Sequence, residues 1–303
     1  MKPTRDVYSL ISSDNTANPF KKYGWEVITS DSGVIIQKYS DLLSVIANVS
    51  YYNSHYNLFF RGQRGDFINP GGKIHNSIVL PTIYRPPDNQ RRLLKEVKEL
   101  RSKYLQFCED CLVKSILERK YINNEYFTGF NKLFSYREMK WSILQHYEVC
   151  KTPLLDITQS IQTATTFALR NNPNEYGYIY VIALPYITGA ISFYTYEEIL
   201  NIKLASICMP KALRPHFQEA FLIGFFPLSD IRDSLAIFPQ SKSMDFSNRI
   251  VLKIRITNID KFWDTHLPTP ETMLIPPSDP LSEVCDRVKY ELSVEYPHEN
   301  VFI

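Results

Sequence analysis

The stretch Leu58-Phe59-Phe60-Arg61-Gly62-Gln63 decides how this chain is interpreted. Three apolar residues that run into an arginine and a glycine are typical of the end of a buried strand. Arg61 would then leave the core at the edge of a cleft, where a guanidinium can hold a phosphate or a carboxylate through two parallel hydrogen bonds. Gly62 would let the backbone approach a ligand. The alternative is an Arg61 that pairs with a nearby acid.

The composition around this stretch is that of a globular protein. A chain of 303 residues could form one large domain or two small ones, and its apolar fraction of 44% suits a well-buried core. The net charge of +2 requires neither nucleic acid nor an anionic membrane as a partner. Because no apolar run is long enough for a signal region or a bilayer span, we expect a cytoplasmic protein that does not bind membranes.

The five cysteines are odd in number and scattered, which favours reduced cytosolic thiols. Cys108 and Cys111 form a C-x-x-C pair, but no second Cys or His pair lies at metal-ligand spacing. The sequence therefore predicts no metal site.

The segments flanking the Arg61 stretch predict a mixture of short strands and helices. Residues 25–38 match a hairpin with its turn at 30–33, and residues 41–49 have helical spacing. Residues 64–73 are expected to be a loop, and residues 79–85 are a second apolar stretch interrupted by proline.

A long helix is expected at residues 89–120, where apolar residues recur every three or four positions. Its first half is basic and contains Arg91, Arg92, Lys95, Lys98, Arg101 and Lys103. These side chains could contact a nucleic-acid backbone. Glu96 and Glu99 interrupt the patch, which favours an ordinary solvated helix face.

The second half of the chain predicts further helices and a set of strands. A helix at 137–147 ends in Gln145-His146-Tyr147, and a short strand ends at Asp156. Thr158 can cap a helix at 159–170. We expect strands at 178–184, 189–194, 220–226 and 250–256, and helices at 197–209 and 281–290. The pattern indicates one α+β domain over 1–303, with a core at about 40–260, a helical insertion at about 88–148, and a proline-rich linker with a C-terminal helix at 264–303.

These segments resemble the FRG domain, a bacterial family named for its Phe-Arg-Gly stretch, which here is Phe60-Arg61-Gly62. Further matching blocks follow in order over about residues 60–226: Leu80-Pro81-Thr82-Ile83-Tyr84-Arg85, Gln145-His146-Tyr147, Thr152-Pro153-Leu154-Leu155-Asp156-Ile157-Thr158, Ala164 with Phe167-Ala168, and the segment 214–219. Ile157 stands where the family usually has Trp, and Ala220 where it usually has Gly.

The same blocks are similar, more weakly, to the Arg, Ser-Thr-Ser and Glu elements of ADP-ribosyltransferases. Thr158 takes the place of the last Ser, and Ala164 and Phe167 follow it by six and nine residues, as they do in those enzymes. Asp156 and Ile157 differ from the first Ser and the Thr. The resemblance implies an ADP-ribosyltransferase-like split β-sheet core.

The third element of the resemblance is a glutamate at the start of an apolar strand, a place that Glu219 occupies. Those enzymes carry Glu or Gln two positions earlier, where this chain has Phe217, and Gln218 lies one position earlier. This departure argues against arginine as the acceptor of ADP-ribose more than it argues against catalysis itself. A surface Glu219 paired with Arg214 is the structural alternative.

The resemblance implies NAD as the substrate, with Glu219, Arg61 and Thr158 as catalytic residues. The residues implied to bind NAD are Arg61, Gly62, Gln63, His146, Tyr147, Asp156, Thr158 and Gln218. Cleavage of the nicotinamide–ribose bond passes through an oxocarbenium-like centre, which a carboxylate stabilises. Thr158 as a plain helix cap, and His146 and Tyr147 as core residues, are the structural alternatives.

Three functional hypotheses follow. The first is an ADP-ribosyltransferase that modifies a protein, an RNA or a DNA, as a bacterial toxin or an antiphage defence effector, with an antitoxin as a further partner. The second is a non-catalytic FRG sensor that binds a nucleotide or a nucleic acid. The third is a nucleic-acid-binding protein that uses the basic helix, whose binding would depend steeply on salt.

Overall fold

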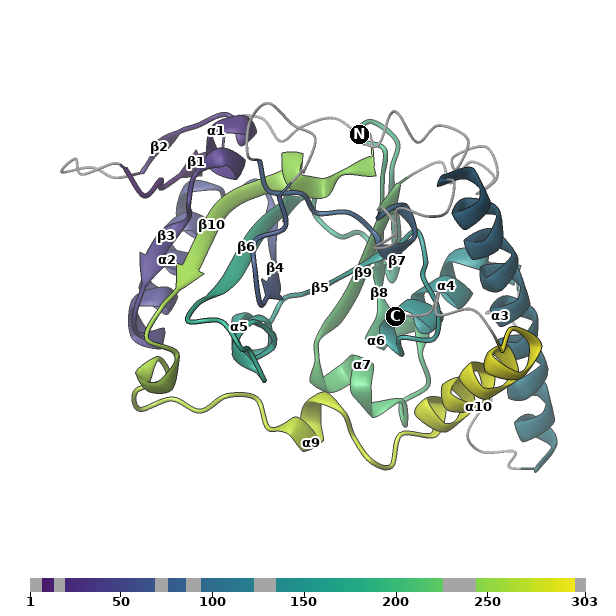
Figure 1. Cartoon of the computed structure of the whole chain (residues 1–303). Helices are drawn as coiled ribbons and strands as arrows, with labels where there is room; N and C mark the ends of the chain where they lie inside the picture. The colour runs from purple at the N-terminus through teal and green to yellow at the C-terminus, as the bar shows by residue number, and fades with distance from the viewer. Residues whose placement is uncertain are drawn as a thin grey trace. The chain divides into compact units, whose positions relative to one another are not determined.

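A computed structural model describes residues 7–13, 20–68, 76–85, 94–122, 135–225 and 244–297, with the backbone alone for 94–98 and 119–122. The chain divides into two compact units (Figure 1). The first unit comprises Met1–Val79, Ile157–Ile187 and Asp245–Leu274, and the second comprises Leu80–Asp156, Thr188–Met244 and Ile275–Ile303. The predicted α+β class is confirmed, since both units combine strands with helices.

The first unit is built on a mixed sheet. Its strands are β3 (Val34–Ile36), β10 (Ile250–Ile256), β6 (Gly177–Leu184) and β4 (Asn57–Gln63), in that order. The pair β3–β10 is parallel, and β10–β6 and β6–β4 are antiparallel. The end of β5 (Leu155–Thr158) pairs antiparallel with β4 at Phe60 and Thr158. The predicted strands at 178–184 and 250–256 are therefore confirmed within one residue.

Helix α5 (Ile161–Leu169) packs directly on this sheet, with almost no side chain between its backbone and two strands. A Cβ placed on Gly62 of β4 would lie 1.8 Å from the carbonyl oxygen of Ala164, and one on Gly177 of β6 would lie 2.8 Å from that of Ala168. Real Cβ atoms do not approach so closely, so the sheet accepts α5 only where these two strands carry glycine.

The predicted hairpin at 25–38 is wrong. Residues Trp25–Ser30 form helix α1, and the turn at Asp31–Gly33 leads into β3, which pairs with β10 far along the chain. The turn itself was placed correctly, and Gly33 has a φ of +94° that favours glycine. Ile28 and Thr29 are fully buried, so packing of α1 outweighs the strand propensity of the Val-Ile-Thr run.

The remaining elements of the first unit surround the sheet. They are β1 (Tyr8–Ser9), β2 (Lys21–Lys22), α2 (Tyr39–Tyr52), the 3₁₀ turns η4 (Phe246–Arg249) and η5 (Ile259–Lys261), and α9 (Glu271–Leu274). Helix α2 contains the predicted helix at 41–49 and extends it at both ends. Its apolar face is buried through Leu42, Ile46 and Val49.

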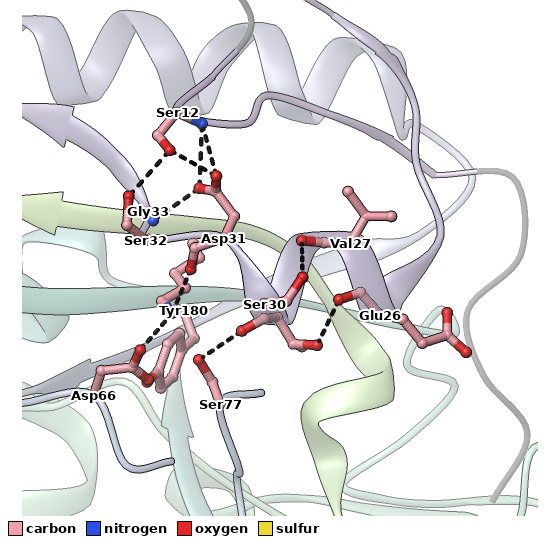
Figure 2. A network of polar contacts seen from close by, with 12 residues as sticks. Ser12, Glu26, Val27, Ser30, Asp31, Ser32, Gly33, Asp66, Ser77 and Tyr180 are labelled. Atoms are coloured by element: carbon pink, nitrogen blue, oxygen red, sulfur yellow. Dashed lines mark hydrogen bonds and ion pairs between the residues drawn. The ribbon is translucent and has the colours of Figure 1, made fainter. Parts of the chain in front are cut away.

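A polar network ties α1 to the strands of the first unit (Figure 2). The carboxylate of Asp31 accepts hydrogen bonds from the backbone N–H groups of Ser12 and Gly33, and its backbone carbonyl accepts one from Lys253 Nζ at 2.7 Å. Lys253 also pairs with Asp66, and both side chains lie inside the protein, with 3% and 12% exposed. The network fixes a buried charge pair beneath the turn at Asp31.

The second unit contains the sheet β9–β8–β7, with β9 (Ala220–Phe225), β8 (Ile199–Lys203) and β7 (Ile191–Tyr194) all antiparallel. The predicted helix at 197–209 is wrong over its first half, which contains β8, while its second half contains the short helix α6 (Leu204–Ile207). The run Ile199-Leu200-Asn201-Ile202 is buried along its whole length, and such a run does not distinguish a strand from a helix.

Helices make up the rest of the second unit. They are η1 (Thr82–Tyr84), α3 (Leu94–Ile122), α4 (Arg137–His146), α7 (Leu213–Phe217) and α10 (Pro280–Glu295). Helices α4 and α10 both pack against α3 (Figure 1). The predicted helices at 89–120, 137–147 and 281–290 are confirmed by α3, α4 and α10, except that residues 89–93 lie outside the described part of the chain.

A buried glutamate joins α3 to α4. Glu109 is 1% exposed and accepts hydrogen bonds from Trp141 Nε1 at 2.7 Å and from Arg137, while Lys140 Nζ lies 3.0 Å from its other oxygen. Three donors on one helix thus satisfy a single carboxylate on the other, which is how a buried charge is tolerated.

All five cysteines of the chain belong to the second unit. Cys108, Cys150, Cys208 and Cys285 are buried, and Cys111 is half-buried. Burial, followed by nearby charges, raises the pKa of Cys111 to about 11. The Cys111 thiol is therefore protonated at neutral pH, and a protonated thiol is a poor nucleophile.

No helix among the described residues combines the length and the apolar character that crossing a membrane would need.

Candidate functional site

Arg61 lies within β4. The strand was expected to end at this arginine, but it continues to Gln63. Phe59 and Phe60 before it are buried, and Arg61 itself is half-buried opposite Tyr180 of β6. Gly62 faces α5, so its missing side chain makes room for that helix. The two residues of the predicted site thus occupy different environments on the same strand.

Gln63 joins the polar network of the first unit through Tyr180, which Figure 2 labels. It is 8% exposed and forms a hydrogen bond with Tyr180, whose hydroxyl donates to Asp66 Oδ1 at 2.6 Å. Burial and then the charge of Asp66 raise the pKa of Tyr180 above 10, while hydrogen bonds to Ser77 and Gln63 lower it. Gln63 therefore supports the buried Asp66–Lys253 pair.

Thr158 ends β5 and starts the connection to α5. Its hydroxyl oxygen accepts the backbone N–H of Ser160 at 3.0 Å, and it is 7% exposed. The prediction that Thr158 caps the helix is wrong: Ser160 is the N-cap, and its hydroxyl accepts the N–H of Thr163 at 3.2 Å. Two successive hydroxyls therefore organise the entry into α5.

The pairing of β4 with β5 sets the directions of the predicted catalytic side chains. Phe60 lies directly opposite Thr158, so their side chains share one face of the sheet. Arg61 is the next residue of β4, and its side chain points to the other face. The fold brings the two motifs onto neighbouring strands, and the register directs Arg61 and Thr158 to opposite faces.

A second group of predicted residues surrounds Asp156 in the second unit. Asp156 Oδ2 accepts a hydrogen bond from Gln145 Nε2 at 2.9 Å, and Oδ1 lies 3.0 Å from His146 Nδ1. The side-chain oxygen of Gln145, Oε1, accepts hydrogen bonds in turn from the hydroxyls of Thr82 and Thr152, at 3.2 and 2.7 Å. One-third of the Asp156 side chain remains exposed, so a satisfied carboxylate still reaches the surface.

His146 is buried and carries no charge at neutral pH. Burial lowers its pKa from 6.5, against the opposing effects of the hydrogen bond and the charge of Asp156. Since both Asp156 oxygens accept, Nδ1 carries the proton and Nε2 presents its lone pair. Nε2 is enclosed and has no hydrogen-bond partner within the described ranges. The arrangement can hold a neutral imidazole as a hydrogen-bond acceptor.

His146 gives the protein a measurable pH dependence. Its pKa is lower when folded than when unfolded, so below pH 6.5 the unfolded chain binds the extra proton and the folded state loses stability as the pH falls. We expect the free energy of unfolding to fall less steeply in His146→Asn than in the wild type from pH 6.5 to about 5. Urea unfolding across this range measures the slopes.

The control for this experiment is His216→Asn, which replaces an exposed histidine of the same unit. Its free energy of unfolding at neutral pH is expected to match that of the wild type, because surface substitutions usually change stability little. Equal slopes for His146→Asn and the wild type would contradict the assignment of a neutral, buried His146.

Sequence reasoning gave two arginines of the second unit no place in the site, the half-buried Arg85 and the buried Arg101. Burial lowers the pKa of Arg85, and the charge of Asp156 opposes this. Arg85 Nε donates to the carbonyl of Leu80 at 3.0 Å. Arg101 is 4% exposed and donates to the carbonyls of Ile83 and Arg85, so it is not part of a solvated basic helix face as expected.

Tyr147 is directed away from the surface. It is 1% exposed, and its hydroxyl donates to Asp279 Oδ2 at 2.8 Å. Asp279 also accepts the backbone N–H groups of Arg214 and Leu281, and it is the N-cap of α10. Burial and the Asp279 charge raise the pKa of Tyr147. An Asp followed by Pro280 is a helix-start signal that could have identified Asp279 from sequence.

Gln218 and Glu219 form the corner between α7 and β9. Gln218 is buried, and its backbone N–H donates to the carbonyl of Arg214 at 3.1 Å. Glu219 is exposed and adopts a left-handed backbone with a φ of 46°. The guanidinium of Arg214 pairs with Glu148 at 2.7 Å. The carboxylate of Glu219 therefore faces solvent immediately before a buried strand.

The predicted residues thus form two sets. Arg61, Gly62, Gln63 and Thr158 belong to the first unit, and His146, Tyr147, Asp156, Gln218 and Glu219 belong to the second. Within the second set, His146 forms a hydrogen bond with Asp156. The rings of His146 and Tyr147 also lie close together, with centroids 5.7 Å apart. Within the residues described, no cluster of three or more His, Cys, Asp or Glu side chains could hold a metal ion.

Comparison of the chain with family models, with curated proteins and with solved structures gives no match.

Proposed function

We propose that the protein is an ADP-ribosyltransferase-like enzyme that cleaves NAD and transfers ADP-ribose to a macromolecule. The observation that carries the proposal is the pairing of β4 with β5 at Phe60 and Thr158. It places the Phe-Arg-Gly block beside the block that ends in Thr158, although about a hundred residues separate them in the chain. The proposal includes the split-sheet core of that enzyme class, and an intracellular role as a toxin or an antiphage effector.

The three motif blocks have the local structure that the resemblance implies. Arg61 lies in a strand, Thr158 ends a strand that runs into a helix, and Glu219 directly precedes a buried strand. In the proposed reaction the guanidinium of Arg61 holds a phosphate of NAD. The carboxylate of Glu219 stabilises positive charge on the ribose as the bond to nicotinamide breaks, and the acceptor then bonds to the ribose carbon.

Glu219→Gln tests this proposal. The amide keeps the shape of the side chain and removes the charge, so we expect nicotinamide release to fall by about a hundredfold or more. The assay measures nicotinamide release and transfer of label from NAD to protein, RNA and DNA fractions of a cell lysate. An unchanged rate in Glu219→Gln, or no release by the wild-type protein, would reject the proposal.

The chain contains a matched control for this variant. Glu198 is also exposed, also has a left-handed backbone (φ 59°), and also directly precedes a strand of the second unit. Glu198→Gln therefore makes the same chemical change in the same local geometry, and we expect it to retain wild-type activity.

A non-catalytic nucleotide-binding module is the second candidate. It is favoured by the register that directs Arg61 and Thr158 to opposite faces, and by the hydroxyl of Thr158, which already accepts the N–H of Ser160. This candidate predicts that Arg61→Lys weakens NAD binding in a calorimeter, since lysine lacks the planar fork, while Glu219→Gln binds normally and the wild type releases no nicotinamide.

A further inference from the structure

Each oxygen of the Asp156 carboxylate is held by a neutral donor of the second unit. Oδ2 accepts Gln145 Nε2 at 2.9 Å, and Oδ1 lies 3.0 Å from His146 Nδ1, the nitrogen that carries the proton. The His146 side chain is 3% exposed, whereas that of Asp156 is 33% exposed. The carboxylate is therefore fixed in orientation by a donor from the interior, and part of it remains open to solvent.

The amide of Gln145 is itself fixed by two hydroxyl groups. The Thr82 hydroxyl oxygen accepts the backbone N–H of Thr152 at 3.2 Å, and the Thr152 hydroxyl oxygen accepts that of Leu154 at 3.2 Å. Both hydroxyls then donate their own protons to Gln145 Oε1. A reversed amide would direct its oxygen at the Asp156 carboxylate, where two acceptors would repel each other. The amide NH₂ group therefore stays directed at Asp156.

His146 supports this carboxylate at a cost in stability. Its Nε2 is enclosed and has no hydrogen-bond partner in the described part of the chain, and burying an acceptor without a partner opposes folding. Water can solvate a carboxylate that reaches the surface, so the fold does not require a buried histidine behind Asp156. Local departures from good packing and pairing are concentrated at functional sites. The unpartnered nitrogen therefore points to a function for the carboxylate that His146 holds.

The surroundings of Asp156 select a neutral ligand that donates hydrogen bonds. The positive charge of the half-buried Arg85 already acts on the Asp156 carboxylate, and it would repel a second cation brought to the same place. Neutral hydroxyl groups avoid this repulsion. Because Gln145 and His146 take one oxygen each, both oxygens are held in the same way, and together they match the two adjacent hydroxyl groups of a ribose.

We propose that Asp156 binds the adjacent 2′- and 3′-hydroxyl groups of a ribose of NAD, and that Gln145 and His146 are its positioning residues. The inference rests on the proposed function for the identity of the ligand. Both riboses of NAD carry this pair of hydroxyl groups, so the experiment has to distinguish between them. The role given to Asp156 differs from that of Glu219, because Asp156 holds hydroxyl groups whereas Glu219 stabilises the charge that develops on the ribose.

Calorimetric titration of the full-length protein with NAD and two dideoxy analogues tests the inference. One analogue lacks both hydroxyl groups of the adenosine ribose, and the other lacks both hydroxyl groups of the nicotinamide ribose. We expect the wild type to bind one analogue about tenfold or more weakly than NAD, and that analogue identifies the ribose at Asp156. Asp156→Ala should bind NAD and this analogue with equal affinity, since the group that distinguishes them is absent.

The positioning residues are tested by the same affinity ratio between the analogue and NAD. His146→Leu and Gln145→Leu each remove one donor to Asp156, and each should lower the ratio by about threefold or more. His146→Asn should keep the ratio of the wild type, because its amide can donate in place of Nδ1. A variant that only loosens the fold weakens the binding of both ligands alike and leaves the ratio unchanged. These variants also decide the question if Asp156→Ala does not fold.

Asp286→Ala is the matched control, since it removes an exposed carboxylate from α10 of the second unit, and its ratio should equal that of the wild type. Absence of NAD binding, equal binding of NAD and both analogues by the wild type, or an unchanged ratio in Asp156→Ala would overturn the inference. Nicotinamide release is measured separately. A wild type that distinguishes the ligands through Asp156 but releases no nicotinamide supports this inference and rejects the proposed enzyme. Release together with an unchanged ratio in Asp156→Ala does the opposite.

Discussion

Replacement of Gly62 by alanine is expected to lower the free energy of unfolding by about 3 kcal/mol or more. The new Cβ would lie 1.8 Å from the Ala164 carbonyl oxygen, 2.8 Å from the carbonyl carbon and 2.9 Å from the Ala168 N. All three atoms belong to the backbone of α5, which cannot turn aside as a side chain could. Either α5 moves off the sheet or β4 shifts in register, and both changes expose buried apolar surface.

Gly65→Ala is the matched control for this change. Gly65 lies two residues beyond β4, it has no positive φ, and nothing lies within 4 Å of a Cβ placed on it. The variant should unfold within about 0.5 kcal/mol of the wild type, as surface substitutions usually do. Urea unfolding followed by circular dichroism gives both values, and a Gly62→Ala variant as stable as Gly65→Ala would disprove the direct packing of α5 on β4.

Asp66→Asn is expected to destabilise the protein by about 3 kcal/mol. The amide can still accept the Tyr180 hydroxyl, but it leaves the ammonium of Lys253 inside the protein without its opposing charge. Only 3% of the Lys253 side chain is exposed, so water cannot replace the lost carboxylate. Urea unfolding of the variant measures the loss.

The double variant Asp66→Asn with Lys253→Met, compared with the two single variants, measures the interaction energy between the two charged side chains. Because the buried charge is removed together with its partner, the double variant should be more stable than the sum of the two single losses predicts, by about 1 kcal/mol or more. Asp286→Asn breaks the exposed Lys289–Asp286 pair, whose side chains are 40% and 64% exposed, and should cost little. Strict additivity of the buried pair would show that Lys253 and Asp66 do not interact.

The sequence was sufficient to predict elements whose pattern is local. Helices α2, α3, α4 and α10 follow from apolar residues that recur with helical spacing, strand β6 follows from an apolar run, and strand β10 follows from a run in which Lys253 and Arg255 alternate with apolar residues. The elements that were predicted wrongly depend on distant partners. The run at Val34–Ile36 pairs with β10 instead of the segment before it, and the run at Ile199–Lys203 lies between β7 and β9.

The candidate site was predictable in part. The bond between His146 and Asp156 joins two motif blocks that had been identified from their residues. The orientation of side chains was not predictable, because it depends on the register of Phe60 with Thr158, and a shift of one residue would reverse it. Arg85 was part of a quoted motif block without a role, and its proximity to Asp156 and the bond of Asp279 to Tyr147 were not predicted, since both arise from segments that meet only in the folded chain.

The placement of the cysteines makes the second unit selectively observable. Every thiol of the chain lies there, and a thiol-alkylating reagent reaches the four buried ones only when that unit opens. The first unit contributes no signal to such labelling, since its segments contain no cysteine. The native protein thus carries its own set of reporters for the opening of one half of the molecule, without any engineered label.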